Sequence, residues 1–201
     1  MPQSRAAERM RRRLIDAAVH QLAAHGMRGL THRKMEEHAG VAQGSVKYHF
    51  GSLDGLIEAV LLHMVQIESA HVMQVSPETI AEAQETGTIP PELWEQAKVA
   101  MKAVTANPEL TLARFELLLH VARNPRLQGI LKDARNELVR KTAASMHGPQ
   151  PEEGARMVLA LIDGVLLHQI SAHEPVVDTM APAFILAASS AALHLPSAPP
   201  S

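Results

Sequence analysis

The chain has no cysteine among its 201 residues, which excludes disulfides, thiolate metal sites and cysteine nucleophiles. Aromatic residues make up only 2% of it, and the apolar content is mostly Leu, Ala, Val, Met and Ile. Leu, Ala and Met are strong helix formers, whereas strands are rich in aromatic and β-branched residues. The composition therefore favours a helical protein. A Gly-x-Ser-x-Gly nucleophile elbow is also missing, and we expect no catalytic residues and no enzyme.

Long apolar runs are missing as well. No stretch approaches the 18 consecutive apolar residues that suggest a membrane span. The first 13 residues are polar and basic, with no apolar segment behind them as in a secretory signal peptide. These two features predict a cytoplasmic protein without a membrane partner.

Acidic residues are absent between His38 and Leu53, and charge is unevenly divided along the chain. Residues 1–50 contain nine Arg and Lys against four Asp and Glu, whereas the remainder contains ten against 17. A basic segment joined to an acidic body is typical of a protein that contacts phosphates with one end only.

Helix-capping signals recur along the sequence. Thr31 is a predicted N-cap, with Leu30 and Met35 forming a hydrophobic staple, and Gly40 is the predicted end of that helix. Ser52 is the predicted cap of the fourth helix. Asn-Pro pairs at 107–108 and 124–125 combine an N-cap with proline at the first helical position. We therefore predict an all-α fold, with helices at about 8–24, 31–39, 42–50, 52–75, 91–106, 108–123, 125–146, 151–172 and 179–194.

A helix, a short glycine-containing turn and a second short helix between Thr31 and His49 form a helix-turn-helix pattern. Val41, Val46 and Phe50 are expected to fix the second helix against its neighbours. Gly44 would let the backbone approach DNA closely, and Gln and Arg side chains suit adenine and guanine edges. The residues predicted to bind DNA are Thr31, Arg33, Gln43, Gly44, Ser45, Lys47, Tyr48 and His49.

Four segments, 30–35, 39–41, 44–50 and 52–56, resemble the tetracycline-repressor (TetR) family, in register over about residues 10–62. The resemblance implies that the first three helices and the start of the fourth bind DNA. It also implies that the later helices enclose a ligand pocket and form a dimer, and that ligand binding moves the fourth helix like a lever.

Three positions depart from the family pattern. Lys47 replaces an aromatic phosphate contact and would substitute a charge for it. Leu53 replaces a lysine at the start of the fourth helix, so one phosphate contact is missing. Ala42 replaces the usual Ser or Thr cap of the recognition helix, at a cost of about 1 kcal/mol unless something compensates.

The predicted domains are a helix-turn-helix DNA-binding domain at 1–52, a helical ligand-binding and dimerisation domain at 53–195, and a disordered tail at 196–201. Such a chain would be a homodimeric regulator, released from a pseudo-palindromic operator by a small, apolar effector. No cofactor is expected.

Apolar and histidine side chains on the later helices could line the effector pocket, although each could equally be ordinary core. These pocket candidates are Met64, Trp94, Met101, Phe115, Met157 and His168. The dimer interface is predicted at the last two helices, where Gly164 and the small residues 187–192 permit close packing. Intramolecular packing of these helices is the alternative.

Other patterns leave alternatives open. The arginines at 11–13 form either a solvated segment or an arm that contacts phosphates. The 12 histidines include no pair four residues apart on a helix with a supporting acid, so no metal site is predicted. Two rival functions are a constitutive DNA binder without an effector, and a helical small-molecule or metal-binding protein without sequence-specific DNA binding.

Overall fold

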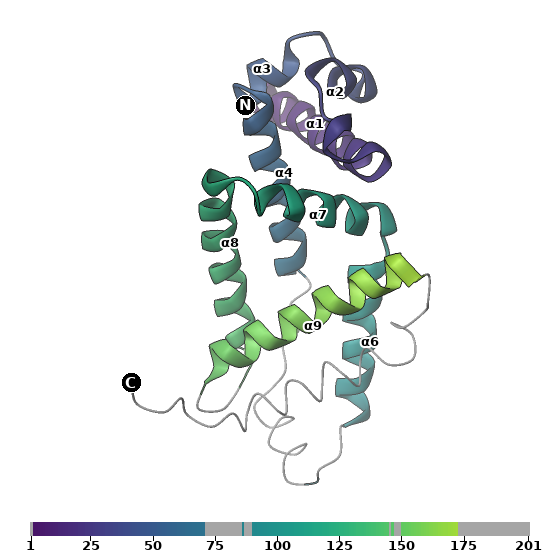
Figure 1. The fold of residues 1–201 in the computed structure, drawn as a ribbon, viewed down its shortest axis with the longest axis vertical. Coiled ribbons are helices and arrows are strands. Elements are labelled where there is room, and N and C mark those ends of the chain that lie inside the picture. Colours follow the sequence, from purple (N-terminus) through teal and green to yellow (C-terminus); the bar gives the residue numbers. More distant parts are fainter. Residues whose placement is uncertain (1, 71–85, 87–89, 145, 147–149, 173–201) are drawn as a thin grey trace. The chain divides into compact units, whose positions relative to one another are not determined.

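The computed structural model describes residues 2–70, 86, 90–144, 146 and 150–172. Every regular element within these residues is a helix, which confirms the all-α prediction (Figure 1). In chain order the elements are α1 (Pro2–His25), the 3-10 turn η1 (Gly26–Gly29), α2 (His32–Ala39), α3 (Ser45–Phe50), α4 (Leu53–Ala70), α6 (Pro91–Thr105), α7 (Pro108–Val121), α8 (Pro125–Ala143) and α9 (Pro151–Ala172).

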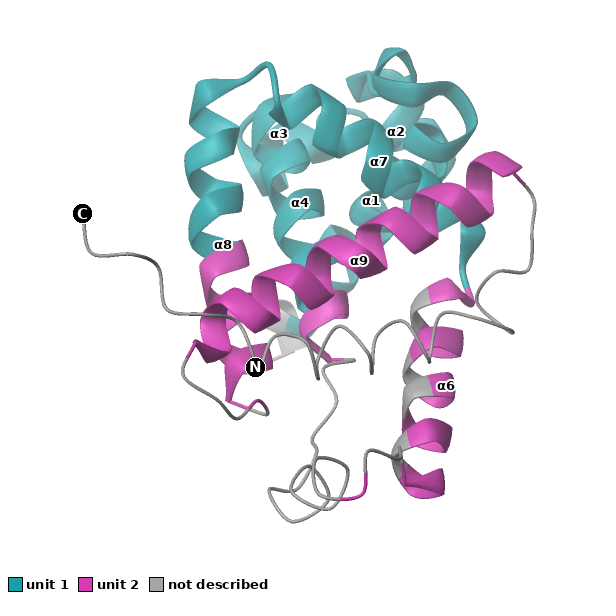
Figure 2. Ribbon diagram, turned by 60° about the horizontal axis from the view of Figure 1, so that its bottom comes forward, with its two compact units in different colours: residues 1–66, 107–134 teal, residues 67–106, 135–201 magenta. Residues whose placement is uncertain are grey.

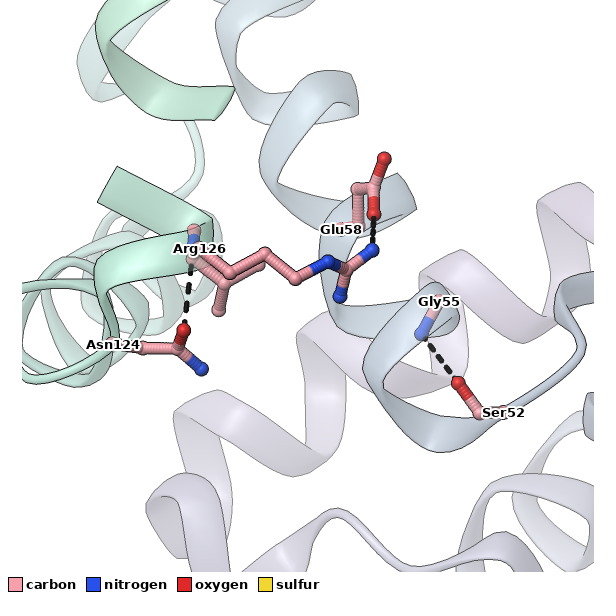
Figure 3. Close-up of polar contacts among 6 residues, drawn as sticks. Ser52, Gly55, Glu58, Asn124 and Arg126 are labelled. Carbon is pink, nitrogen blue, oxygen red and sulfur yellow. Dashed lines mark hydrogen bonds and ion pairs between the residues drawn. The ribbon is translucent and has the colours of Figure 1, made fainter. Parts of the chain in front are cut away.

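The side chains predicted to cap helices accept hydrogen bonds from backbone N–H groups of the first turn, as N-caps do. Two of these helices also begin with the predicted proline. Figure 3 includes the Ser52 cap of α4. The capping bonds are Thr31 with Lys34 (3.3 Å), Ser52 with Gly55 (3.0 Å), Asn107 with Leu110 (2.9 Å) and Asn124 with Leu127 (3.3 Å).

Several predicted boundaries differ from the structure. Helix α1 begins at Pro2 rather than near residue 8. Helix α3 begins at Ser45, not at 42–43, because a turn precedes it in which the Ser45 N–H donates to the Ala42 carbonyl (3.2 Å). The N-cap of α3 is therefore Gly44, and Ala42 does not occupy the cap position assigned from the family pattern. The predicted helix 179–194 and the tail 196–201 lie outside the described residues.

The chain divides into two compact units (Figure 2). Unit 1 comprises residues 1–66 and 107–134, and unit 2 comprises 67–106 and 135–201. Packing therefore joins α4 up to Gln66, all of α7 and α8 up to Ala134 to the first three helices, beyond the predicted boundary at residue 52. The functional assignment of domains 1–52 and 53–195 stays a prediction, because a packing unit does not define which helices bind DNA.

Unit 1 is built around one apolar core. Helix α1 contacts α2, α3 and α7, and the amphipathic spacing of each helix turns its apolar stripe towards the shared interior. The buried residues of this core include Leu14, Ala18 and Leu22 of α1, Met35 of α2, Val46 of α3, Leu56, Val60 and Met64 of α4, and Ala113, Leu117 and Val121 of α7. These helices thus contribute side chains to one close-packed interior.

An ion pair joins the second turn of α4 to the first turn of α8 on the surface of unit 1. The Arg126 guanidinium donates to the Glu58 carboxylate at 2.5 Å (Figure 3). Such partly exposed pairs contribute little to stability. The pair nevertheless identifies the start of α8 as a neighbour of the start of α4, which Ser52 caps.

Unit 2 has its own, smaller cluster of described apolar residues. Met101 of α6 and Val158 and Val165 of α9 are buried together, with Met146 and Leu161 among the partly buried side chains around them. A half-buried ion pair joins α8 to α9 in this unit, with 2.6 Å between Arg135 Nη2 and Asp163 Oδ2.

Helix α9 is, by length and composition, apolar enough to cross a membrane, and it is the one described helix with this property. We expected none from the search for uninterrupted apolar runs. That search missed α9 because Glu152, Glu153, Arg156 and Asp163 interrupt a segment that is apolar on average. Core helices of soluble proteins have the same composition, so the property is weak evidence for a membrane segment.

Candidate nucleic-acid interface

The turn between α2 and α3 is fixed by a Schellman motif at the end of α2. Gly40 has a φ of 59°, in the left-handed region that favours glycine. Its N–H donates to the Glu37 carbonyl (3.1 Å), and the Val41 N–H donates to the Glu36 carbonyl (3.0 Å). These two bonds satisfy carbonyls at the helix end and define where the chain leaves α2.

The inner face of α3 is packed as predicted. Val46 is fully buried, and Val41 and Phe50 pack against the core of unit 1. Close approach of α4 depends on Gly55, because a Cβ atom there would collide with the Phe50 carbonyl oxygen. The sequence between 41 and 55 thus holds α3 against the other helices of the unit.

A buried carboxylate holds the N-terminal end of α3, and we did not predict it from the sequence. Glu36 of α2 is only 4% exposed, and its Oε1 accepts a hydrogen bond from the Val46 N–H at 3.0 Å. A signal was available, because Met35, Glu36 and Ala39 share the buried face of α2. A carboxylate on such a face requires a hydrogen-bonding partner.

A guanidinium holds the C-terminal end of α3. Arg11 of α1 donates to the His49 carbonyl, and its Cζ lies 4.4 Å from the centroid of the Phe50 ring. Helix carbonyls near the C-terminus lack intrahelical partners and attract cations. A negative group at one end of α3 and a positive group at the other therefore match the direction of the helix dipole.

The arginines at 11–13 lie inside α1, and each has an intramolecular partner. Besides the contacts of Arg11, these partners are Asp16 for Arg12 (3.0 Å) and the Gly40 carbonyl for Arg13 (3.3 Å). Arg11 and Arg13 thus contact the helix-turn-helix, whereas Arg12 pairs within its own helix. Arg12 and Arg13 are also exposed, so both alternatives stated for this segment stay predictions.

The outward face of α3 is open to solvent. Tyr48 is 84% exposed, and Lys47 is also exposed, as is Gln43 in the turn before α3. Of the other residues predicted to bind DNA, Thr31, Arg33 and Gly44 are exposed, whereas Ser45 and His49 are half-buried. Their assignment as DNA contacts stays a prediction.

Three of these residues also have structural partners within the chain. Thr31 caps α2, and the Ser45 hydroxyl donates to the Ala42 carbonyl at 2.6 Å. Arg33 donates to Glu37 at 2.8 Å, and this bond and the neighbouring negative charge raise the pKa of Arg33. Because the pair is exposed, its net strength is small and a phosphate or guanine could replace the carboxylate.

The predicted pocket residues are divided between the two units. In unit 1, Met64 belongs to the buried core, and Phe115 is half-buried, its ring centroid 5.4 Å from the Arg114 guanidinium. In unit 2, Met101 is buried, whereas Trp94 is half-buried, and Met157 and His168 are exposed. Their role in effector binding stays a prediction.

The described residues contain no group of three or more His, Asp or Glu side chains that could hold a metal ion. The described functional geometry is instead a short helix, rigidly fixed on its inner face and at both ends, with an exposed polar outer face. This geometry defines a helix-turn-helix DNA-binding protein.

Two family models match the sequence. The model described as bacterial regulatory proteins, tetR family, matches residues 14–60, and the model of the tetracyclin repressor-like C-terminal domain matches residues 93–190. The HTH-type transcriptional regulator BetI of Burkholderia mallei is 25% identical over 183 residues, which cover 90% of this chain and 91% of the relative.

Two solved structures are similar over nearly the whole chain. A member of the TetR family from Streptomyces coelicolor is 22% identical with a TM-score of 0.65, and 90% of this chain and 98% of that chain are covered. The multidrug binding protein EbrR, solved in complex with ethidium, is 25% identical with a TM-score of 0.65 and the same coverage of both chains. The chain belongs to the TetR family and is a DNA-binding transcriptional regulator.

Proposed function

We propose that this protein is a homodimeric repressor that binds a pseudo-palindromic operator and leaves it when a small apolar effector binds. The observation that carries the proposal is the fixed α3 helix with its exposed outer face. One six-residue helix reads few base pairs, so specificity requires two such helices at a defined spacing. The proposed role is regulatory rather than catalytic, and the proposed location is the cytoplasm.

Packing in unit 1 supports a route from effector to DNA. Leu56 and Val60 of α4 and Leu117 of α7 share a core with Met35 and Val46 of the helix-turn-helix. An effector that prefers one arrangement of α4 or α7 would therefore shift the population of DNA-competent molecules. The Arg126–Glu58 pair would carry a displacement of the start of α8 to α4.

The chemistry of the effector is proposed from two sources. The similar protein EbrR is described as multidrug binding and was solved with ethidium, a flat aromatic cation. The predicted pocket residues of this chain are mostly methionine and aromatic side chains, which adapt to apolar ligands of varied shape. We therefore propose a planar or apolar small molecule as the effector.

Selection of duplex DNA by the purified protein, followed by fluorescence anisotropy across salt, tests the operator proposal. We expect an inverted repeat and a steep salt dependence. Tyr48→Ala should weaken binding at least tenfold without lowering the melting temperature, because the side chain is 84% exposed. Lys47→Ala should reduce the slope of log affinity against log salt concentration. We expect a reduction of about one for each α3 helix of the dimer whose Lys47 contacts a phosphate.

Lys102→Ala is the matched control, because it removes an exposed lysine from α6 and should leave both quantities unchanged. Equal binding by Tyr48→Ala and the wild-type protein would contradict the assignment of α3. Titration of ethidium into the same assay tests effector release. Unchanged anisotropy and melting temperature across ethidium and a panel of apolar molecules would favour the constitutive DNA binder.

A further inference from the structure

We propose that Glu36 is the positioning residue of α3, the recognition helix of the helix-turn-helix. Its buried carboxylate replaces the capping side chain that the N-terminal end of α3 lacks. The inference rests on the proposed operator binding, since it assigns a residue that sets the orientation of α3 on DNA. Glu36 does not itself contact DNA in this proposal. It acts through the backbone of Val46.

The first turn of α3 has few possible partners for its N–H groups. Its N-cap, Gly44, has no side chain and adopts a φ of 89°. Ala42, at the position where the family has Ser or Thr, has no side-chain oxygen. The Ser45 N–H donates to the Ala42 carbonyl (3.2 Å), and the Tyr48 N–H donates to the Gly44 carbonyl (2.9 Å). The Val46 N–H is satisfied from outside the helix, by Glu36.

Water is a poor substitute for this carboxylate. The side chain of Val46 is fully buried, and Glu36 is 4% exposed, so the bond between them lies inside unit 1. An N–H group left unsatisfied in such a place carries its full desolvation cost. A negative charge at the first turn of α3 is also favourable because the N-terminal end of a helix dipole is positive.

Glu36 connects the three parts of the helix-turn-helix. It lies in α2, its backbone carbonyl accepts the Val41 N–H of the turn, and its carboxylate accepts the Val46 N–H of α3. One residue thus fixes α2, the turn and the recognition helix relative to one another. A change that removes only the carboxylate should release α3 while the turn and core are kept.

Two variants of similar size separate this role from simple packing. Glu36→Gln keeps an oxygen that can accept the Val46 N–H, whereas Glu36→Met fills the same space without an acceptor. Both variants remove one negative charge, so their general electrostatic effect on DNA binding is the same. Operator affinity and the amide hydrogen exchange of Val46 are measured for each variant, with the Leu22 amide of α1 as an internal reference.

We expect Glu36→Gln to bind the operator within about threefold of the wild-type protein and Glu36→Met to bind about tenfold or more weakly. In Glu36→Met, exchange at Val46 should accelerate relative to Leu22. Equal affinity of the two variants, or unchanged exchange at Val46 in Glu36→Met, would overturn the proposal. The exchange measurement needs no DNA, so it remains decisive even if the wild-type protein has no operator and the proposed function fails.

Discussion

The two compact units differ in how they bury apolar side chains. In unit 1, residues from α1, α2, α3, α4, α7 and the start of α8 enter one buried core. In the described part of unit 2, the buried cluster comes from α6 and α9, and Val99, Met157 and Leu167 are largely exposed. Exposed large apolar side chains occur in both units, among them Leu119 of unit 1 at 58% exposed. The described parts of the two units therefore differ in how many helices share a core, and not in whether they expose apolar surface.

The largest expected effect comes from breaking the core of unit 1. Leu117 of α7 is fully buried, and we expect Leu117→Ala to lower the free energy of unfolding by about 2–5 kcal/mol through lost transfer energy and a cavity. Leu119, two residues along the same helix, is 58% exposed, so Leu119→Ala should change it by about 0.5 kcal/mol or less. Urea unfolding monitored by circular dichroism measures both. Similar losses for the two variants would contradict the shared α1–α7 core.

A second prediction concerns the apolar surface of unit 2. Leu167 of α9 is 49% exposed, and Gly164 on the same helix has open space where a Cβ would lie. If α9 forms the proposed dimer interface, Leu167→Glu buries an unpaired carboxylate there and should weaken dimerisation about a hundredfold, which corresponds to about 3 kcal/mol. Sedimentation velocity should then detect monomers at concentrations where the wild-type protein is dimeric.

Leu119→Glu is the control for that experiment, because it places the same charge on an exposed leucine of α7 in unit 1. It should leave the sedimentation coefficient of the wild-type protein unchanged. If Leu167→Glu dimerises as tightly as the wild-type protein, the dimer interface does not include this face of α9. If Leu119→Glu weakens dimerisation and Leu167→Glu does not, the dimer interface lies on α7 instead.

Local signals in the sequence predicted much of this fold. The caps at Thr31, Ser52, Asn107 and Asn124 and the glycine at 40 predicted five helix ends, because capping depends on residues within one turn. The start of α3 was wrong by two or three residues. The family pattern suggested a cap at 42, whereas Gly44 and the external Glu36 carboxylate set the start instead.

Contacts between distant segments were not predicted. Arg11 and His49 are 38 residues apart, and Arg126 and Glu58 are 68 apart, so no periodicity indicates that either pair meets. Packing of α7 against α1 within unit 1 was missed for the same reason.

The smallest expected effect concerns pH and the α1–α4 boundary in unit 1. Burial lowers the pKa of His63 below its ordinary value of 6.5, and the positive charge of Arg12 lowers it further, while Asp16 opposes this. A pKa that is lower in the folded state means that the unfolded chain binds the proton more tightly. Above about pH 6.5 His63 is neutral in both the folded and the unfolded state and costs no stability. As the pH falls below this value and through the pKa of the folded state, the unfolded chain takes up the proton first, so the free energy of unfolding decreases.

His63→Gln should remove this part of the pH dependence, because glutamine does not titrate. We expect the urea midpoint of the wild-type protein to fall more between pH 7.5 and 5.5 than that of His63→Gln, by a small amount because the imidazole is partly exposed. His32→Gln, which removes an exposed histidine of α2, should leave the His63 contribution in place. Parallel pH profiles for His63→Gln and the wild-type protein would mean that water reaches this part of the α1–α4 boundary. The core of unit 1 would then end nearer the helix-turn-helix than the burial of Val60 and Met64 suggests.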